Sequence, residues 1–204
     1  MASRAVAPLI LASASPYRRR MLENAEVAFS VVPADVDEAL LKRRFAAGKA
    51  QPAAALADAL ARAKAEAVSA RHPDAVVIGA DQVLAVDDEL FDKPGDLAEA
   101  RAQLERLRGR THRLISAVAL AQNGDILWTH IGEAVLTMRR FSPDFLQLYL
   151  AKAGADLCRI VGAYEIEGAG IQLFERVEGD HFTIIGLPLV PLLAELRLRG
   201  VIET

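Results

Sequence analysis

An α/β fold, with a mixed twisted sheet and flanking helices, is predicted by two features of the sequence. In the first half, short apolar runs alternate with helical patterns: Leu9–Ala12 precedes a helix expected over Pro16–Asn24, and a helix over Ala53–Arg71 precedes Val76–Ala80. In the middle, apolar runs on both sides of Asn123-Gly124 indicate an antiparallel hairpin. We therefore expect a mixed sheet, with two lobes around a central cleft.

Length and composition restrict the kind of protein. The 204 residues show no repeat, low-complexity linker or charge block, so we expect a single domain over residues 1–204. A net charge of -3 argues against a nucleic-acid binder or a membrane-surface protein. No apolar run approaches membrane-spanning length, and one cysteine, Cys158, cannot form a disulfide framework within the chain. These features predict a cytoplasmic enzyme.

The first switch from strand to helix has the outline of an anion site. Ser15 supplies a helix N-cap, and Pro16 takes the favoured first-turn position. Ser13, the unpaired N–H groups of the helix start and Arg18–Arg20 lie close to that switch. The alternative is a capped amphipathic helix whose arginines are only solvated.

Carboxylates and a lysine follow. A strand over Phe29–Val32 leads into an acidic loop that runs from Pro33 to Glu38. On the next predicted helix, Lys64 lies four residues after Leu60 and therefore beside the apolar stripe. A solvated surface lysine is the alternative for Lys64.

The apolar strand Val76–Ala80 ends in Asp81-Gln82, and a separate strand is expected over Val83–Val86. An α/β sheet binds its ligands at strand ends, so Asp81 is a candidate site residue. Further along, we expect a helix capped by Asp96 and ending near Arg108, and hairpin strands over Leu114–Ala121 and Ile126–Met138. A helix from Pro143 to Gly154 follows, and then a glycine-rich segment over 161–170 that is compatible with a bulged hairpin. The last expected elements are a strand over Thr183–Ile185 and a helix to about Arg199.

Together these candidates suit phosphoryl chemistry. A nucleoside triphosphate carries a charge of about -4, which requires several Lys or Arg donors and a divalent ion held by carboxylate oxygens. The candidate carboxylates are Asp35, Asp37, Glu38 and Asp81, and the candidate cations are Arg18, Arg19, Lys64 and Lys93. His112, which precedes a predicted strand, is interpreted as structural, and Cys158 as a packing residue.

A family resemblance sharpens this interpretation. The segments that carry it are, in chain order, ASASPYRRRML, DVDEAL, ARAKAEA, GADQV, DKP, GRTH, GAYEIEGAG and GDHFTIIGLPL. From about residue 9 to 198 the chain resembles the Maf family of nucleotide pyrophosphatases. The resemblance implies an inosine-triphosphate-pyrophosphatase-like fold, a homodimer, and cleavage of a nucleoside triphosphate to monophosphate and pyrophosphate with Mg²⁺ or Mn²⁺.

Residue roles follow from the resemblance. Asp81 matches the family's proton acceptor, and Glu38 with Asp81 would hold the metal. Ser13, Arg18, Lys64 and Lys93 match positions around the phosphates, to which we add Arg19 because it could also stabilise phosphate charge.

Base selectivity is expected from Tyr17, Gln82 and Glu167. This set departs from the family branch that handles dTTP and UTP, and resembles the branch that acts on 7-methyl-GTP, although that branch typically has Trp at the position of Tyr17. Tyrosine can stack on a purine cation, glutamate can accept from the guanine edge, and glutamine offers a donor and an acceptor. Three alternatives are a broad pyrophosphatase, a dTTP/UTP-type pyrophosphatase and a non-catalytic nucleotide-binding regulator of cell division.

Overall fold

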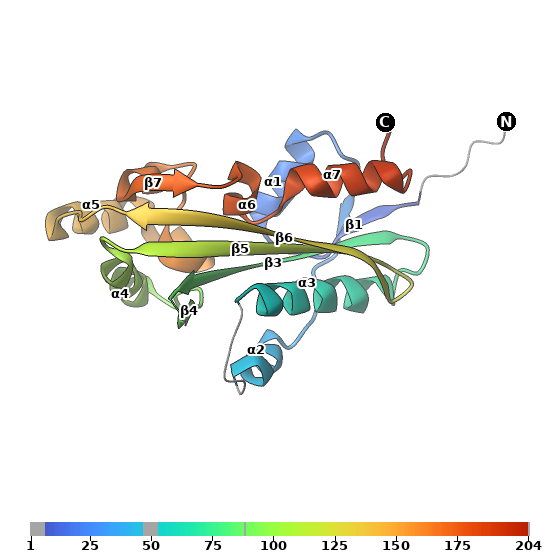
Figure 1. Ribbon diagram of the computed structural model, residues 1–204, viewed down its shortest axis with the longest axis horizontal. Helices are drawn as coiled ribbons and strands as arrows, with labels where there is room; N and C mark the ends of the chain where they lie inside the picture. The colour runs from blue at the N-terminus through green and yellow to red at the C-terminus, as the bar shows by residue number, and fades with distance from the viewer. Residues whose placement is uncertain (1–6, 47–52, 88, 204) are drawn as a thin grey trace.

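The computed structural model describes residues 7–46, 53–87 and 89–203 (Figure 1). The strands are β1 (Leu9–Leu11), β2 (Ser30–Val31), β3 (Val76–Val86), β4 (Glu89–Phe91), β5 (Thr111–Gln122), β6 (Asp125–Met138) and β7 (Phe174–Glu178). The α-helices are α1 (Pro16–Asn24), α2 (Glu38–Ala46), α3 (Ala53–Ser69), α4 (Leu97–Leu107), α5 (Pro143–Ala153), α6 (His181–Ile185) and α7 (Leu189–Leu198). Three short 3₁₀ segments are η1 (Gly154–Arg159), η2 (Val161–Ala163) and η3 (Ala169–Leu173).

The strands form one mixed sheet in the order β2-β1-β3-β5-β6-β7, with β4 paired to β3. β1 runs parallel to both β2 and β3, and the remaining pairs are antiparallel. The predicted hairpin is β5–β6, and both Asn123 and Gly124 have positive φ values, 53° and 84°, as its two-residue turn requires. The predicted α/β fold with a mixed sheet is therefore confirmed.

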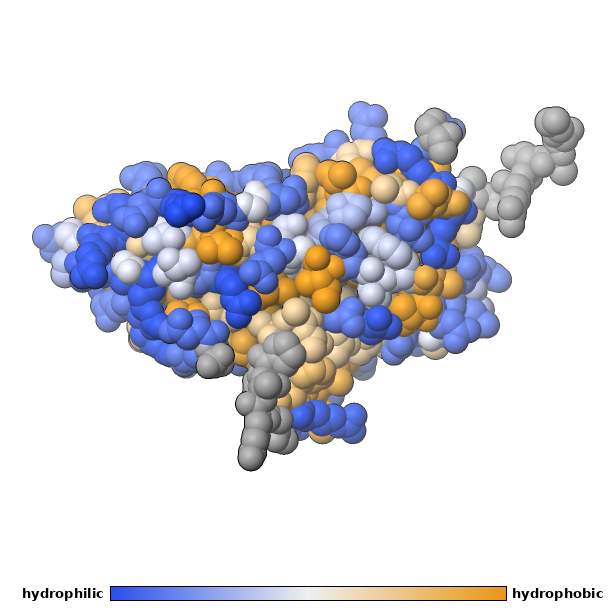
Figure 2. All heavy atoms as spheres, in the orientation of Figure 1, coloured by the Kyte–Doolittle hydropathy of each residue, from blue (hydrophilic) through white to orange (hydrophobic). Residues whose placement is uncertain are grey.

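Helices cover both faces of the sheet. α3 lies along one face, while α1, α6 and α7 lie on the other, and α4 and α5 gather at the far end of the long strands (Figure 1). Leu56 and Leu60 of α3 pack on Ile115 of β5, whereas Leu22 and Leu192 share a second cluster with Ile78. Figure 2 shows a weakly hydrophobic surface over the alanine-rich α3.

Two predicted strand assignments are wrong. β3 is one continuous strand, so Asp81 and Gln82 lie in its middle and not at a strand end. The side chains of Asp81 and Gln82 both have hydrogen-bond partners within the fold, so these polar residues can lie in the interior of a strand. Thr183–Ile185 forms part of α6, because Asp180 caps the helix by accepting from the Thr183 N–H, and Gly186 ends it with a φ of 113°.

The acidic loop is also shorter than predicted. Asp37 Oδ1 accepts from the Leu40 N–H at 2.8 Å, so Asp37 caps a helix that begins at Glu38. The glycine-rich segment contains the 3₁₀ segments η2 and η3 in place of a hairpin, with Gly162 at a φ of 80°. The strands β4 and β7 were not predicted. Among the described residues, no helix is long and apolar enough to cross a membrane.

Candidate active site

A cavity of about 630 Å³ opens between the β1–α1 loop, α2, α3, the middle of β3 and the segment after β4. It brings together most of the residues that the sequence singled out. The predicted site residues that line it are Ser13, Tyr17, Arg18, Glu38, Lys64, Asp81, Gln82 and Lys93.

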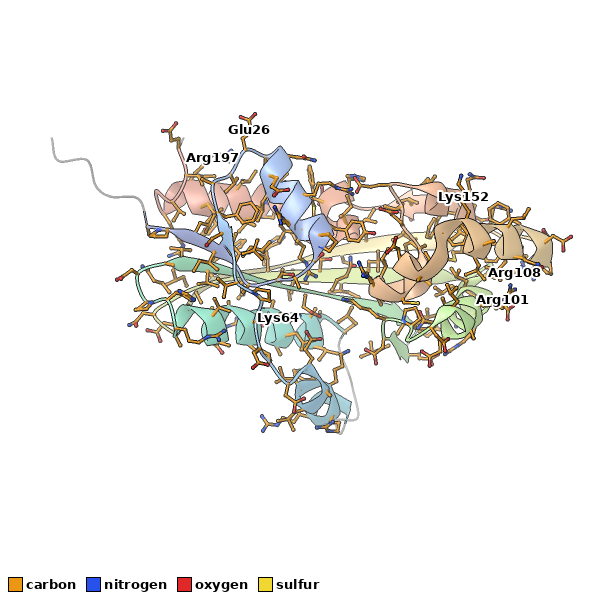
Figure 3. All side chains as sticks on the ribbon, turned by 180° about the vertical axis from the view of Figure 1, so that it is seen from behind. Glu26, Lys64, Arg101, Arg108, Lys152 and Arg197 are labelled. Atoms are coloured by element: carbon orange, nitrogen blue, oxygen red, sulfur yellow. The ribbon has the colours of Figure 1, made fainter. Side chains whose placement is uncertain are left out.

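Lys64 is shared by two carboxylates at the centre of the cavity. Its Nζ lies 2.6 Å from Asp81 Oδ1 and 2.7 Å from Glu38 Oε1. The Lys64 and Asp81 side chains are only 12% and 13% exposed, so this ion pair is largely removed from water. Burial raises the pKa of Glu38, but the Lys64 ammonium outweighs it and holds that pKa below its usual value. Figure 3 shows Lys64 at the middle of the molecule, with the other labelled charged residues towards its edges.

The close approach of α3 to β3 places Lys64. Gly79 faces α3, and a β-carbon there would lie 2.2 Å from the carbonyl oxygen of Ala61. Asp81 follows two residues later and therefore points to the same face of the strand. The absence of a side chain at Gly79 thus lets the ammonium of Lys64 reach the carboxylate of Asp81.

Arg18 is fixed by backbone oxygens. Its Nε donates to the carbonyl of Gly186 at 2.8 Å, and its Nη1 donates to the carbonyl of Ala80 at 2.9 Å and to Ser13 Oγ at 3.3 Å. Burial lowers the pKa of Arg18, against the opposite effect of Asp81 and Glu38. Among residues 7–46, 53–87 and 89–203, no group accepts a hydrogen bond from the two Nη2 donors of Arg18.

The β1–α1 turn has the predicted cap. Ser15 Oγ accepts from the Arg18 N–H at 3.4 Å, and Pro16 is the first helical residue. Ser13 is buried, and its Oγ accepts from the Ser15 N–H at 3.2 Å. This turn places the start of α1 at the edge of the cavity.

Lys93 lies on the loop after β4 and contributes a further cation to the lining. The pKa of Lys93 is lowered, first by desolvation from the surrounding protein and then by the positive charges of Arg18 and Lys64. Asp81 and Glu38 oppose that shift. Three cations and two carboxylates therefore act on one another across the cavity.

Arg19 does not join this group. Its Nε lies 2.7 Å from Glu23 Oε1, its side chain is 61% exposed, and it is absent from the cavity lining. Successive residues of a helix point about 100° apart, and at position 19 this turn directs the side chain towards Glu23 and away from the cavity that Tyr17 and Arg18 line. The prediction that Arg19 lies with the other phosphate-site cations is wrong.

The three base-selectivity candidates meet in a small recess of about 40 Å³. Tyr17 and Gln82 line both the recess and the large cavity, so the two spaces adjoin. Glu167 belongs to the recess alone. The fold thus gathers residues from α1, β3 and the segment after η2.

Gln82 has fewer hydrogen-bonding groups available for a ligand than the sequence suggested. Its Nε2 donates to Ser116 Oγ at 3.0 Å and to the carbonyls of Thr183 and Ile184 at 3.2 and 3.0 Å. Three acceptors around the amide nitrogen fix its orientation. Only the Oε1 acceptor is therefore left for a ligand.

Sequence reasoning missed several residues here. Glu165 lines the recess and, after burial, is the main cause that raises the pKa of Tyr17, so the phenol keeps its proton. Lys42, which pairs with Asp92, and Arg159 both line the large cavity. The alternation of Glu165 with Glu167 and the i,i+4 spacing of Glu38 and Lys42 were the available signals.

Glu38 and Asp81 are the carboxylates placed to act as metal ligands. Among the described residues, no group of three His, Cys, Asp or Glu side chains is placed to hold an ion. Glu38 and Asp81 are nevertheless brought to a common point by Lys64. Mg²⁺ is commonly bound by one or two carboxylates together with substrate phosphates and water, so this pair fits a divalent ion that arrives with a phosphate ligand.

Comparison with known proteins gives the family. A family model described as Maf-like protein matches residues 8–199. The chain belongs to the Maf-like protein family. The family membership that the sequence motifs suggested is confirmed, and the match covers every residue of the cavity lining.

Curated relatives resemble this Maf-like chain along nearly its whole length. Proteins named 7-methyl-GTP pyrophosphatase from Mesorhizobium japonicum and Rhizobium etli are 52% and 48% identical, over 96% of this chain and 98% of each relative. A nucleoside triphosphate pyrophosphatase of Paramagnetospirillum magneticum is 53% identical over 94% of this chain and 98% of the relative. Among solved structures, a nucleoside-triphosphatase (dITP/XTP pyrophosphatase) from Mycobacterium abscessus matches with a TM-score of 0.40 and 16% identity, over 95% of each chain.

Proposed function

We propose that this protein hydrolyses a guanine-type nucleoside triphosphate, with 7-methyl-GTP preferred, to the monophosphate and pyrophosphate. The observation that carries the proposal is Lys64 bridging Asp81 and Glu38 in a cavity that opens into the recess of Tyr17, Gln82 and Glu167. The names of the Mesorhizobium japonicum and Rhizobium etli relatives support the same substrate.

Asp81 is the proton acceptor in the proposed reaction. A water molecule attacks the α-phosphorus and gives its proton to the Asp81 carboxylate, while the bond from the α-phosphorus to the oxygen bridging to the β-phosphorus breaks. Lys64 holds that carboxylate in place through its 2.6 Å contact. The electron pair of the broken bond leaves with pyrophosphate.

Cations stabilise the charge on the phosphates. Arg18 offers its Nη2 donors, and the ammonium of Lys93 lies across the same cavity. A Mg²⁺ or Mn²⁺ ion held by Glu38 and Asp81 would supply further polarisation of the phosphate oxygens. Because the carbonyls of Gly186 and Ala80 hold the Arg18 guanidinium before the substrate binds, this group needs little reorganisation as the charge moves.

The recess distinguishes the base. Tyr17 stacks on the purine, and a methylated, cationic ring adds a cation–π contribution of roughly 0.5–2 kcal/mol. Glu167 accepts from the guanine N1–H and the exocyclic amine, whereas uracil and thymine offer it only one N3–H donor, flanked by two acceptor carbonyls. Mispaired polar groups of this kind can discriminate by about 10⁴-fold.

The test is a product analysis with a panel of triphosphates. Purified protein is supplied with Mg²⁺ or Mn²⁺ and with 7-methyl-GTP, GTP, UTP or dTTP, and pyrophosphate and orthophosphate are measured separately. We expect pyrophosphate and monophosphate in equal amounts, with the highest kcat/KM for 7-methyl-GTP. Release of orthophosphate and diphosphate, or equal kcat/KM for all four substrates, would contradict the proposal.

A further inference from the structure

Arg20 contacts two of the three residues that we assign to base selectivity. Its Nη2 lies 2.5 Å from Glu167 Oε2, and its guanidinium carbon lies 5.5 Å from the centroid of the Tyr17 ring. Tyr17 and Arg20 are three residues apart on α1, on neighbouring positions of one helix face. Glu167 comes from a segment 147 positions away in the sequence. Arg20 therefore links two sides of the recess that come from segments far apart in the sequence.

The contact between Arg20 and Glu167 is not explained by a contribution to the stability of the fold. The side chains of Arg20 and Glu167 are 51% and 34% exposed, and an exposed ion pair adds little to the free energy of unfolding. Arg20 also lines neither the large cavity nor the recess. It is therefore not one of the cations that would contact the phosphates. What the contact does is hold the Glu167 carboxylate and the Tyr17 ring in one relative position.

We infer that Arg20 is a positioning residue for base selectivity, an inference that rests on the proposed function. A carboxylate offers about four acceptor positions, so the bond from Arg20 leaves enough capacity for the two donors of a guanine edge. An aromatic ring has two faces, and contact of the guanidinium with one leaves the other for a stacked base. Arg20 thus arranges both groups before a nucleotide arrives.

The benefit comes from preorganisation. A free Glu167 would lose side-chain conformational freedom each time it bound a guanine edge, and that loss would weaken binding. His181 also faces this carboxylate, with its Nε2 3.6 Å from Glu167 Oε1, so Arg20 and His181 approach the two oxygens separately. Uracil offers Glu167 a single N3–H donor between two carbonyls, in place of the two adjacent donors of guanine, and therefore gains less from the positioning of Glu167. Arg20 should therefore act more strongly on guanine-type substrates than on UTP.

The chain offers a closely matched control. Arg19 is the adjacent residue of α1, and its salt bridge with Glu23 lies outside both cavities. Arg19→Ala and Arg20→Ala remove the same charge from neighbouring positions of one helix. Arg20→Lys keeps the charge and the reach but loses the planar guanidinium, so it measures how much of the effect a simple cation restores.

Steady-state kinetics with 7-methyl-GTP, GTP and UTP would be measured for the wild type and these three variants. We expect Arg20→Ala to raise KM for both guanine substrates about fivefold, with a smaller rise for UTP and with kcat unchanged for all three. Arg20→Lys should recover part of this loss, and Arg19→Ala should match the wild type. A purely structural role would instead raise KM for UTP equally or lower kcat for all three substrates, and would overturn the inference.

Binding without hydrolysis separates this inference from the proposed function. Calorimetric titration with 7-methyl-GMP, GMP and UMP needs no turnover, and Arg20→Ala should weaken the two guanine ligands about fivefold while Arg19→Ala does not. If no triphosphate is hydrolysed but this pattern appears, the proposed reaction fails and the role of Arg20 stands. If the wild type binds the three monophosphates equally, or Arg20→Ala behaves like Arg19→Ala, the role of Arg20 is excluded.

Discussion

Gly79 and Ala61 are in backbone contact: a β-carbon at Gly79 of β3 would lie 2.2 Å from the carbonyl oxygen of Ala61 in α3. The same position would also place that carbon 2.6 Å from the Ala65 nitrogen. Backbone atoms of a helix cannot move aside as a flexible side chain can. The separation of α3 and β3, and with it the distance from Lys64 to Asp81, therefore depends on a glycine at position 79.

Gly79→Ala should accordingly lower both stability and activity. Overpacking of this kind costs about 1–3 kcal/mol, and we expect that loss in the free energy of unfolding measured by urea denaturation. Hydrolysis should fall further than the unfolded fraction explains, because Lys64 is displaced. Gly95→Ala is the control, since its β-carbon would meet only the exposed Glu99 carboxylate at 3.3 Å. Equal stability and activity of Gly79→Ala and the wild type would disprove the spacing argument.

Asp81→Asn should abolish hydrolysis while the protein stays folded. The amide keeps the size of the side chain but cannot accept the proton, so we expect a loss of about 100-fold or more in kcat. Lys64 keeps its contact with Glu38 in this variant, which limits the effect on stability. Asp58→Asn, an acid on α3 paired with Arg62 at 2.6 Å, is a control outside the cavity. Retention of more than about a tenth of the wild-type rate would rule out a general base at position 81.

Glu167→Gln should relax base selectivity. An amide donates to a pyrimidine carbonyl and loses one charged acceptor for guanine, so the ratio of kcat/KM for 7-methyl-GTP over UTP should fall about 10-fold or more. The measurement is competition between the two substrates in one reaction. Glu175→Gln, at an exposed position of β7, controls for the loss of a negative charge. An unchanged ratio would remove Glu167 from the selectivity set.

Tyr17→Ala should weaken the methylated base more than the neutral one. Loss of the ring removes stacking for both, but the cation–π component of roughly 0.5–2 kcal/mol is lost only for the 7-methylguanine cation. Binding of 7-methyl-GMP and GMP to the variant, measured by calorimetry, reports the difference directly. Equal losses for the two ligands would mean that Tyr17 contributes packing alone.

His112 predicts a pH dependence of stability. It is buried, its Nε2 lies 2.8 Å from the Tyr164 hydroxyl, and burial lowers its pKa from 6.5 to about 4. Between these two values the unfolded chain binds the proton and the folded one does not, so the stabilisation present above pH 6.5 is lost as the pH falls towards 4. The expected loss from this residue is roughly 3 kcal/mol. Urea denaturation between pH 4 and 7 should show a smaller decline in His112→Gln, and identical slopes would exclude His112 as the cause.

Much of the fold could be predicted because its signals are local. The Ser15 cap with Pro16, the Asn123-Gly124 turn and the apolar stripe of α3 each depend on residues within about one turn or one hairpin of one another. Two predictions failed for different reasons. Asp81 lies in mid-strand, where it meets Lys64 of another element. Thr183–Ile185 is helical because the Asp180 cap and Gly186 prevail over the strand preference of its apolar, β-branched residues.

For the site, the chemical groups could be read from the amino-acid sequence: two carboxylates, several cations and a tyrosine with an acidic partner in the glycine-rich segment. How these groups are used depends on the tertiary contacts. The turn of α1 directs Arg18 and Arg19 to different sides of the helix. The amide nitrogen of Gln82 donates to backbone carbonyls of α6, and Arg20 pairs with Glu167. Residue types are written in the chain, but a contact between segments more than a hundred positions apart exists only after strands and helices pack, and packing sets the direction in which each side chain points.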